Sequence, residues 1–295
     1  MVKLKKTMKK IGKIFLCFLL VVALVNILAP LFCKKPDGKY AKNLQQTEFT
    51  SETAGAERIR CIDDNEEALL WRLRMIGTAK ESIVLSTFDL RADENGTKLL
   101  AALNHAADKG VKIQLLIDGI YQQLFLSGNS DFQALAAHEN VEVGVYNPVT
   151  PLNLFKLNYR MHDKYLIIDE KIYLLGGRNS NDIFLGDQTE DINVDRDILV
   201  YDTSEGKGES LLQLEDYFHK IWNEGCVSIR TRKQSSKYTD QYQNMEELYT
   251  SLLEKYNDIA LLADLMGHES IETTRIYLRK TASEQQAIVD KIVTW

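Results

Sequence analysis

The chain has 295 residues, of which 45% are hydrophobic and 26% charged, and its formal net charge is −6. These values exclude a wholly disordered chain, a collagen-like fibre and a small disulfide-stabilised domain, and they allow one large domain or two small ones. The charge is unevenly distributed, since residues 1–42 contain ten lysines, no arginine and one acidic residue, Asp37. The remaining chain is therefore strongly acidic, which argues against sequence-independent binding of nucleic acid.

An uncharged apolar stretch follows the basic segment 1–13 and occupies residues 14–33, IFLCFLLVVALVNILAPLFC. At ~1.5 Å per residue it spans about 30 Å, the thickness of the hydrocarbon core of a bilayer. A buried core helix is one alternative, but core helices are rarely apolar on every side over such a length. A cleaved signal peptide would end in small residues, whereas Leu31 and Phe32 stand here. The stretch predicts a retained, single-pass transmembrane anchor.

Lysines on the two sides of this anchor predict its orientation. Six precede it and four follow it, which favours a cytoplasmic N-terminus and an extracytoplasmic body at the cell membrane. That compartment permits a disulfide between Cys61 and Cys226, but two cysteines 165 positions apart are predicted instead to be two separate buried thiols, with the disulfide as the alternative.

The body shows alternating helix and strand patterns. Residues 34–56 lack apolar periodicity and are predicted to be a tether. Helical patterns occupy residues 66–75 and 96–109, strand patterns residues 82–88 and 111–118, and a further helix–strand pair residues 131–146. This alternation predicts an α/β fold over residues 57–230, with a mixed, largely parallel sheet flanked by helices. Residues 231–256 are predicted to be a linker and helix, and residues 257–295 an α-helical tail.

One segment carries the residue types of phosphodiester chemistry. His162 and Lys164 are two residues apart in a strand-like segment, so their side chains are expected to face the same way. An imidazole can take a phosphoryl group covalently while an ammonium offsets charge on the non-bridging oxygens. Backbone amides at Gly176 and Gly177 and the amide of Asn179 add neutral donors. No carboxylate cluster is present to hold a metal, and no cofactor is expected.

The segment resembles the phospholipase D superfamily, whose signature is His-x-Lys, four residues, Asp, six residues, Gly-Gly or Gly-Ser, one residue, Asn. The matching positions are His162, Lys164, Asp169, Gly176, Gly177 and Asn179. The likeness covers about residues 57–230 and is closest to the cardiolipin synthase-like members of the family. Residues 193–195 resemble the Asn-x-Glu segment of these members, with Asp195 at the position of the glutamate.

The resemblance implies a role for each matching residue. His162 would be the nucleophile or general acid, and Lys164 and Asn179 would hold the phosphate. Asp169 would support the strand geometry, and Asp195 would orient His162. The family joins two such motifs across a pseudo-twofold axis, whereas this chain carries one, so a symmetric homodimer would have to supply the second.

The end of the chain has a different likeness. Residues 257–281 resemble the C-terminal end of tyrosine recombinases (phage integrases), with His268 at the late active-site histidine and Tyr277 at the nucleophile. The earlier His-x-x-Arg box of that family has no counterpart upstream. A lone tyrosine without cationic neighbours cannot stabilise a transferring phosphate, so the tail is predicted to be an appendage without recombinase activity.

Together these features predict a membrane-anchored, phospholipase D-like phosphatidyltransferase or phosphodiesterase that acts through a phosphohistidine when dimerisation supplies a second motif. The expected partners are a phospholipid substrate, the bilayer and a second copy of the chain, with no specific nucleic acid. Two alternatives stay open: a catalytically silent truncated fragment fused to an integrase tail, and a homodimeric phosphodiesterase acting on nucleic acid.

Overall fold

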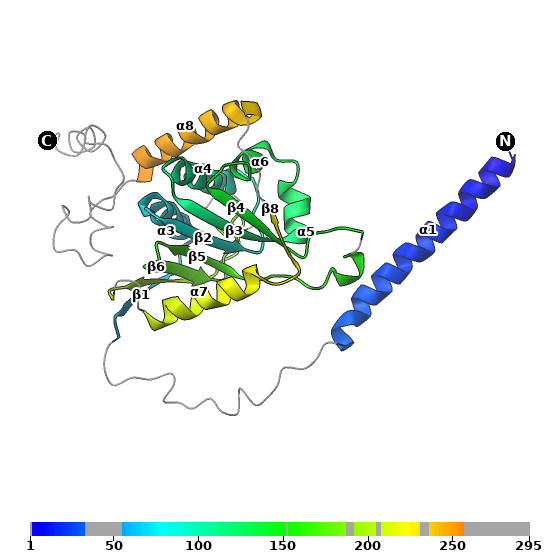
Figure 1. Ribbon diagram of the computed structural model, residues 1–295, viewed down its shortest axis with the longest axis horizontal. Coiled ribbons are helices and arrows are strands. Elements are labelled where there is room, and N and C mark those ends of the chain that lie inside the picture. The colour runs from blue at the N-terminus through cyan, green and yellow to red at the C-terminus, as the bar shows by residue number, and fades with distance from the viewer. Residues whose placement is uncertain are drawn as a thin grey trace, which may run out of the picture.

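The computed structural model describes residues 2–32, 55–151, 153–186, 192–204, 208–230 and 236–256. A long helix, α1 (Val2–Leu28), continues into a 3-10 turn, η1 (Ala29–Phe32), and lies to one side of an α/β body (Figure 1). Most of the predicted tether and the whole integrase-like tail, with His268 and Tyr277, lie outside the described residues, so the interpretations placed there stay predictions.

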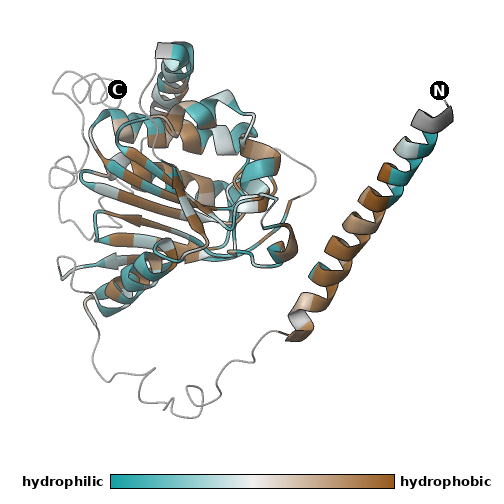
Figure 2. Ribbon diagram, turned by 45° about the vertical axis from the view of Figure 1, so that its right-hand side comes forward, coloured by the Kyte–Doolittle hydropathy of each residue, from teal (hydrophilic) through white to brown (hydrophobic). Residues whose placement is uncertain are grey.

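Helix α1 alone, within the described part of the chain, is long and apolar enough to cross a membrane by length and composition. Its apolar side chains point outward: Phe15 is 60% exposed and Leu20 61% exposed. Figure 2 shows the hydrophobic colour continuing along most of this helix. A core helix would bury these side chains, so their exposure favours the membrane anchor over the core-helix alternative.

An eight-stranded sheet forms the body, in the order β1-β7-β6-β5-β2-β3-β4-β8. The strands are β1 (Glu57–Ile62), β2 (Ser82–Thr87), β3 (Lys112–Asp118), β4 (Val141–Tyr146), β5 (Lys164–Ile168), β6 (Ile172–Gly176), β7 (Asp197–Asp202) and β8 (Val227–Arg230). The mixed α/β fold is confirmed, but the expectation of a largely parallel sheet was wrong. Only β2, β3 and β4 run parallel, and the other five pairings are antiparallel. The short turn between β5 and β6 leaves no room for the crossover that parallel strands need.

Helices cover both faces of the sheet (Figure 1). One face carries α3 (Asn65–Thr78), α4 (Glu94–Asp108), α6 (Ser130–Leu135) and α8 (Thr239–Tyr256), and the other carries α7 (Glu209–Trp222). Side chains start two of these helices, because Asp64 accepts the Glu67 amide at 2.7 Å and Asp93 accepts the Gly96 amide at 3.1 Å. Shorter turns are α5 (Gly119–Tyr121), η3 (Gln122–Leu126), η4 (Leu154–Lys156) and η5 (Ser236–Tyr238).

Helix α8 belongs to the packed body. Met245, Tyr249 and Leu252 are buried in the same core as α3 and α4. The body therefore extends past residue 230, into the region predicted to be a linker and helix.

Cys61 and Cys226 are free thiols in the structure, and Cys61 is exposed. The prediction of two buried thiols does not describe them, and neither does the alternative of a disulfide between them. Cys61 lies on β1 and Cys226 precedes β8, the two outermost strands of the sheet. Strands are spaced about 4.8 Å apart, so the two residues lie far beyond the Cα separation that a disulfide spans.

Candidate functional site

Of the predicted site residues, all except Asp169 lie at one edge of the sheet, where β2 ends and β5 begins. Thr87 pairs with Lys164 across these antiparallel strands. Gly176, at the end of β6, pairs with Asp197, at the start of β7, at the same edge. The Thr87 hydroxyl donates to Ser180 Oγ at 3.1 Å, which ties the segment after β6 to the end of β2. The fold thus brings residues 162–164 together with residues 176–180.

His162 and Lys164 are in direct contact. Lys164 Nζ lies 3.2 Å from each ring nitrogen of His162 and donates to the His162 carbonyl oxygen at 2.8 Å. His162 precedes β5 rather than lying within it as predicted, and the pair forms because the lysine folds back over its neighbour. The ring of Phe88 packs edge-on against the imidazole, with centroids 4.5 Å apart. Lys164 is buried, whereas His162 stays exposed to solvent, so an incoming ligand can reach the imidazole.

Burial and nearby charge act together on this pair. Burial lowers the pKa of His162, and the positive charge of Lys164 lowers it further, against an opposing effect of Asp163. Burial also lowers the pKa of Lys164, while Asp163 and Asp195 oppose that shift. A lowered pKa keeps the imidazole neutral to lower pH, and the neutral ring is the form that can act as a nucleophile.

Replacing Lys164 with glutamine is expected to raise the pKa of His162, because a cation that disfavours the imidazolium is removed. NMR titration of the His162 ring protons measures this shift directly and does not depend on activity. Lys171→Gln is the matched control, since it removes a lysine charge at the opposite end of the β5–β6 hairpin and is expected to leave the titration unchanged. A His162 midpoint that stays put or falls in Lys164→Gln would contradict the assignment.

Asn179 is buried and its oxygen Oδ1 has no hydrogen-bond partner among the described residues. An unpaired buried polar atom costs about 1–3 kcal/mol. Asn179 therefore has a hydrogen-bond acceptor that the described chain leaves unused.

The two glycines are explained by a close approach of backbone and side chains. A Cβ on Gly176 would overlap Asp197, and a Cβ on Gly177 would overlap the carboxylate of Asp195. The segment leading into β7 therefore leaves no room for a side chain at either glycine. Their role as phosphate-binding donors stays a prediction.

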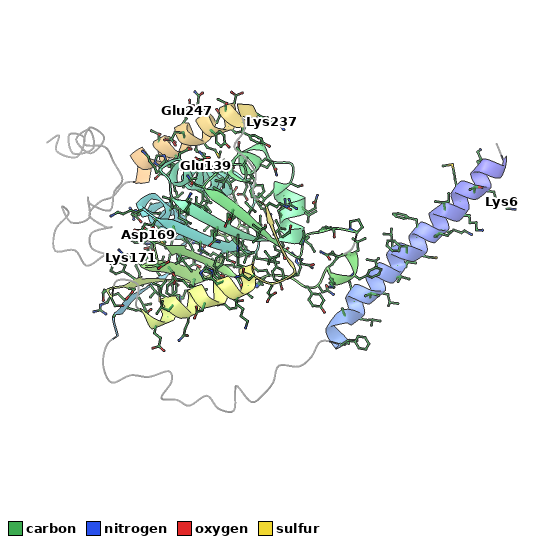
Figure 3. The ribbon with its side chains drawn as sticks, in the orientation of Figure 1. Lys6, Glu139, Asp169, Lys171, Lys237 and Glu247 are labelled. Atoms are coloured by element: carbon green, nitrogen blue, oxygen red, sulfur yellow. The ribbon has the colours of Figure 1, made fainter. Side chains whose placement is uncertain are left out.

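Asp169 lies at the other end of β5 from the His162–Lys164 pair, on the side of the body away from α1 (Figure 3). Its carboxylate accepts the backbone amides of Lys80 and Glu81, both at 2.7 Å, and of Ser82 at 2.9 Å. These bonds tie the β5–β6 turn to the start of β2. Asp169 thus supports strand geometry and is not brought together with the reacting groups.

Asp195 lies beside the site, but it does not contact the imidazole. Its carboxylate accepts the Arg196 amide at 2.7 Å and its charge acts on Lys164. No hydrogen bond joins it to His162 among the residues that the structure describes. The predicted role of Asp195 in orienting His162 is therefore not supported by a direct contact among the described residues.

Arg160 was missed by the sequence reasoning. Its guanidinium makes a bidentate pair with the buried carboxylate of Asp118, at 2.8 and 2.6 Å. It also lies over the rings of Phe88 and Tyr121, 4.9 and 5.3 Å from their centroids. The signal was available, since Arg160 stands two positions before His162, as Lys164 stands two positions after it.

Arg178 was also missed, although it stands between two predicted site residues. It is 1% exposed and donates to Asn65 Oδ1 at 2.8 Å and to Asp197 Oδ2 at 3.3 Å. Arg72 donates to the same oxygen of Asp197 at 2.9 Å. This buried cluster fixes the backbone between Gly177 and Asn179.

This edge brings together the Lys164 ammonium, the His162 ring and the carboxylates of Asp163 and Asp195, whose charges act on Lys164. The ammonium suits an anionic oxygen ligand. Within the residues described, no group of three or more His, Cys, Asp or Glu side chains is placed to hold a metal ion. The Lys164 ammonium can therefore attract an anionic oxygen beside the exposed His162 ring.

Comparison with known proteins gives consistent likenesses. The family described as "Cardiolipin synthase, PLD-like domain" matches residues 73–222. Cardiolipin synthase C of Escherichia coli (strain K12) is 27% identical over 183 residues, which cover 59% of this chain and 36% of that protein. Cardiolipin synthase of Clostridium perfringens (strain 13 / Type A) is 33% identical over 162 residues, which cover 54% of this chain and 32% of that protein. The chain thus spans about a third of the length of these curated relatives.

Among solved structures, the phospholipase D family member Nuc from Salmonella typhimurium is similar at 16% identity with a TM-score of 0.44. The match covers 59% of this chain and 99% of that one.

Proposed function

The chain belongs to the PLD-like domain family of the cardiolipin synthases, and on that basis we propose that it is a membrane-anchored enzyme that attacks a phospholipid phosphodiester through His162. It would act as a phosphatidyltransferase or as a hydrolase. The observation that carries the proposal is the exposed His162 ring with the Lys164 ammonium 3.2 Å from both of its nitrogens.

In this mechanism a neutral ring nitrogen of His162 attacks the phosphorus atom, and the bond from phosphorus to the leaving alcohol breaks. The Lys164 ammonium and the Asn179 amide hold the non-bridging oxygens, where charge develops in the transition state. A second, protonated histidine gives its proton to the leaving oxygen. The same histidine then takes a proton from water or an acceptor alcohol, whose attack on the phosphohistidine releases His162.

The second histidine is proposed to come from a second copy of the chain. His105 lies 2.8 Å from Glu246, and His138 lies 3.0 Å from Asp108, so both are engaged elsewhere. His219 packs beside Phe218 on α7. None of these bonds to His162 in the described part of the chain. A twofold axis beside the exposed His162 would pair two identical motifs.

The membrane enters the proposal through α1. The exposed apolar side chains of this helix need a nonaqueous surrounding, and a bilayer supplies it. The lysine distribution favours a body on the extracytoplasmic side. An anchor of this kind keeps the site close to its lipid substrate.

A paired measurement on the full chain tests the proposal. Light scattering is expected to give a dimer, and the protein is expected to turn over labelled phosphatidylglycerol while leaving labelled DNA intact at low salt. Cleavage of DNA without lipid turnover would favour the nucleic-acid phosphodiesterase instead. A strict monomer without turnover of either substrate would favour the silent fragment.

A further inference from the structure

The body contacts helix α1 through residues 153–159, the segment that contains η4 and leads into the His162 motif. Asn26 Nδ2 donates to the Leu154 carbonyl at 2.8 Å, and the Asn158 amide donates to the Asn26 carbonyl. The rings of Phe18 and Phe155 meet edge to face, with centroids 6.2 Å apart. Figure 1 shows this loop of the body reaching the lower part of α1.

These contacts place the segment at bilayer depth. Phe18 and Asn26 both lie inside the uncharged stretch 14–33, whose length matches the hydrocarbon core. An amide in hydrocarbon is costly unless a neighbouring group satisfies it. Asn26 Nδ2 donates to Val22 within its own helix and also to Leu154. One of the two acceptors of the Asn26 amide is therefore Leu154, a residue of the body. This contact holds Leu154 beside the part of α1 that lipid would surround.

The same segment exposes aromatic side chains. Phe155 is 39% exposed and Tyr159 54% exposed, and the basic residue Lys156 lies between them. Aromatic rings with a lysine or arginine nearby are typical of the boundary between headgroups and acyl chains, where the ring is buried and the cation reaches the phosphates.

A second apolar element flanks the site from the turn after β3. Leu124 is 67% exposed and Phe125 40% exposed. Phe125 stacks on Tyr121, which packs on Phe88, the ring that contacts His162. The exposed pair is thus connected to the imidazole through two aromatic rings.

Cations lie among these rings. The Arg91 guanidinium lies 4.5 Å from the centroid of Phe125, and that of Arg160 lies 5.3 Å from the centroid of Tyr121. Each arginine is also paired with a carboxylate, Arg91 with Asp89 and Arg160 with Asp118. The surface around these rings is therefore apolar and cationic without a large excess of positive charge. Such a surface suits a lipid headgroup layer better than an acidic polymer, which requires many unpaired cations.

We propose that residues 153–159 and the pair Leu124–Phe125, together called the rim, insert into the bilayer beside α1. The rim would hold His162 and Lys164 at the level of the lipid phosphates, so that a phospholipid reaches the site without leaving the membrane. The insertion of the rim rests on the membrane anchor of the proposed function, but not on its catalytic activity or its substrate.

Spin labelling of the full chain tests the insertion. The four native cysteines, Cys17, Cys33, Cys61 and Cys226, are replaced by serine, and one cysteine is introduced at Leu124, Tyr159 or Lys171. Lys171 is the control, because it lies on the side of the body away from α1 (Figure 3). Each labelled protein is reconstituted into vesicles of phosphatidylglycerol and phosphatidylcholine. Nitroxide collision rates are then measured with oxygen, which partitions into lipid, and with a water-soluble nickel chelate.

Labels at Leu124 and Tyr159 are expected to favour oxygen, and the label at Lys171 to favour the nickel chelate. Equal nickel accessibility at all three positions would overturn the proposal. Spin–spin broadening between rim labels, without a preference for oxygen, would also overturn it, because a second copy of the chain would then cover the rim. These collision rates can be measured without any turnover. If the protein shows no His162-dependent activity, the proposed function is refuted, while the collision rates still decide whether the rim inserts.

A double variant, Leu124→Asp with Tyr159→Asp, tests the consequence for substrate delivery. Turnover of phosphatidylglycerol in vesicles is expected to fall about tenfold, since charge in the rim weakens its insertion, while turnover of a short-chain, water-soluble analogue is retained. An equal loss on both substrates would overturn the role of the rim in delivering lipid. The label at Lys171 and circular dichroism report whether the variant is folded.

Discussion

His162→Ala is expected to lower the turnover of phosphatidylglycerol by on the order of a hundredfold or more, because it removes the proposed nucleophile and its proton-transfer capacity. Lys164 would remain and would still attract the phosphate, so lipid binding should change less than turnover. The measurement is the rate of head-group release by the full chain in vesicles, under conditions in which every copy is saturated with lipid.

The matched control for this variant is His219→Ala. It removes an exposed imidazole from α7 that has no hydrogen bond to the site, and it is expected to retain turnover. Trapping of a radiolabelled phosphatidyl group gives an independent readout, since wild type should carry an acid-labile label that His162→Ala lacks. Undiminished turnover in His162→Ala would remove this residue from the mechanism.

Asp197→Ala is expected to destabilise the fold by about 3–5 kcal/mol, the usual cost of removing one partner from a buried ion pair. Its carboxylate is fully buried and its Oδ2 accepts from both Arg72 and Arg178. Removal of this acceptor leaves two buried guanidinium groups without their shared counter-charge. Urea unfolding of the full chain in detergent, followed by circular dichroism, measures the change.

Asp63→Ala is the comparison for the buried cluster. Asp63 pairs with Arg196 at 2.5 Å, but both side chains are largely exposed, and water screens such a pair. Its removal is expected to leave the unfolding midpoint nearly unchanged. Similar losses of stability in the two variants would show that burial does not increase the contribution of the Asp197 cluster to the free energy of unfolding.

The parallel part of the fold and the reacting pair could be predicted from local patterns. Helical and strand periodicities alternate up to β4. The two-residue spacing of His162 and Lys164 predicted that they meet, although the contact forms because the lysine folds back and not through strand alternation. The direction of β5, β6 and β7 could not be predicted, because a short apolar run does not encode whether its neighbour runs parallel or antiparallel. The sheet order separates β5 from β4 by two strands, which no local signal indicates.

The residue roles that local patterns could not supply share a physical cause, which is contact between residues far apart in the sequence. Asp169 binds backbone amides of residues 80–82, so its role depends on a strand nearly ninety positions earlier. Arg178 looks like a surface residue by type, since arginine is rarely fully buried unless paired. Its partners, Asn65 and Asp197, become its neighbours only when β1, β6 and β7 assemble.

The buried arginine between Gly177 and Asn179 has an evolutionary consequence. Because Arg178 and Asp197 stabilise the fold, selection for a folded protein is enough to preserve them, even in a lineage where catalysis has been lost. His162 is exposed, and within the described residues its ring is hydrogen-bonded to Lys164 alone, so random drift could erase it at little cost to folding. Natural variation at these two sets of positions would therefore separate genes kept for their chemistry from genes decaying toward pseudogenes.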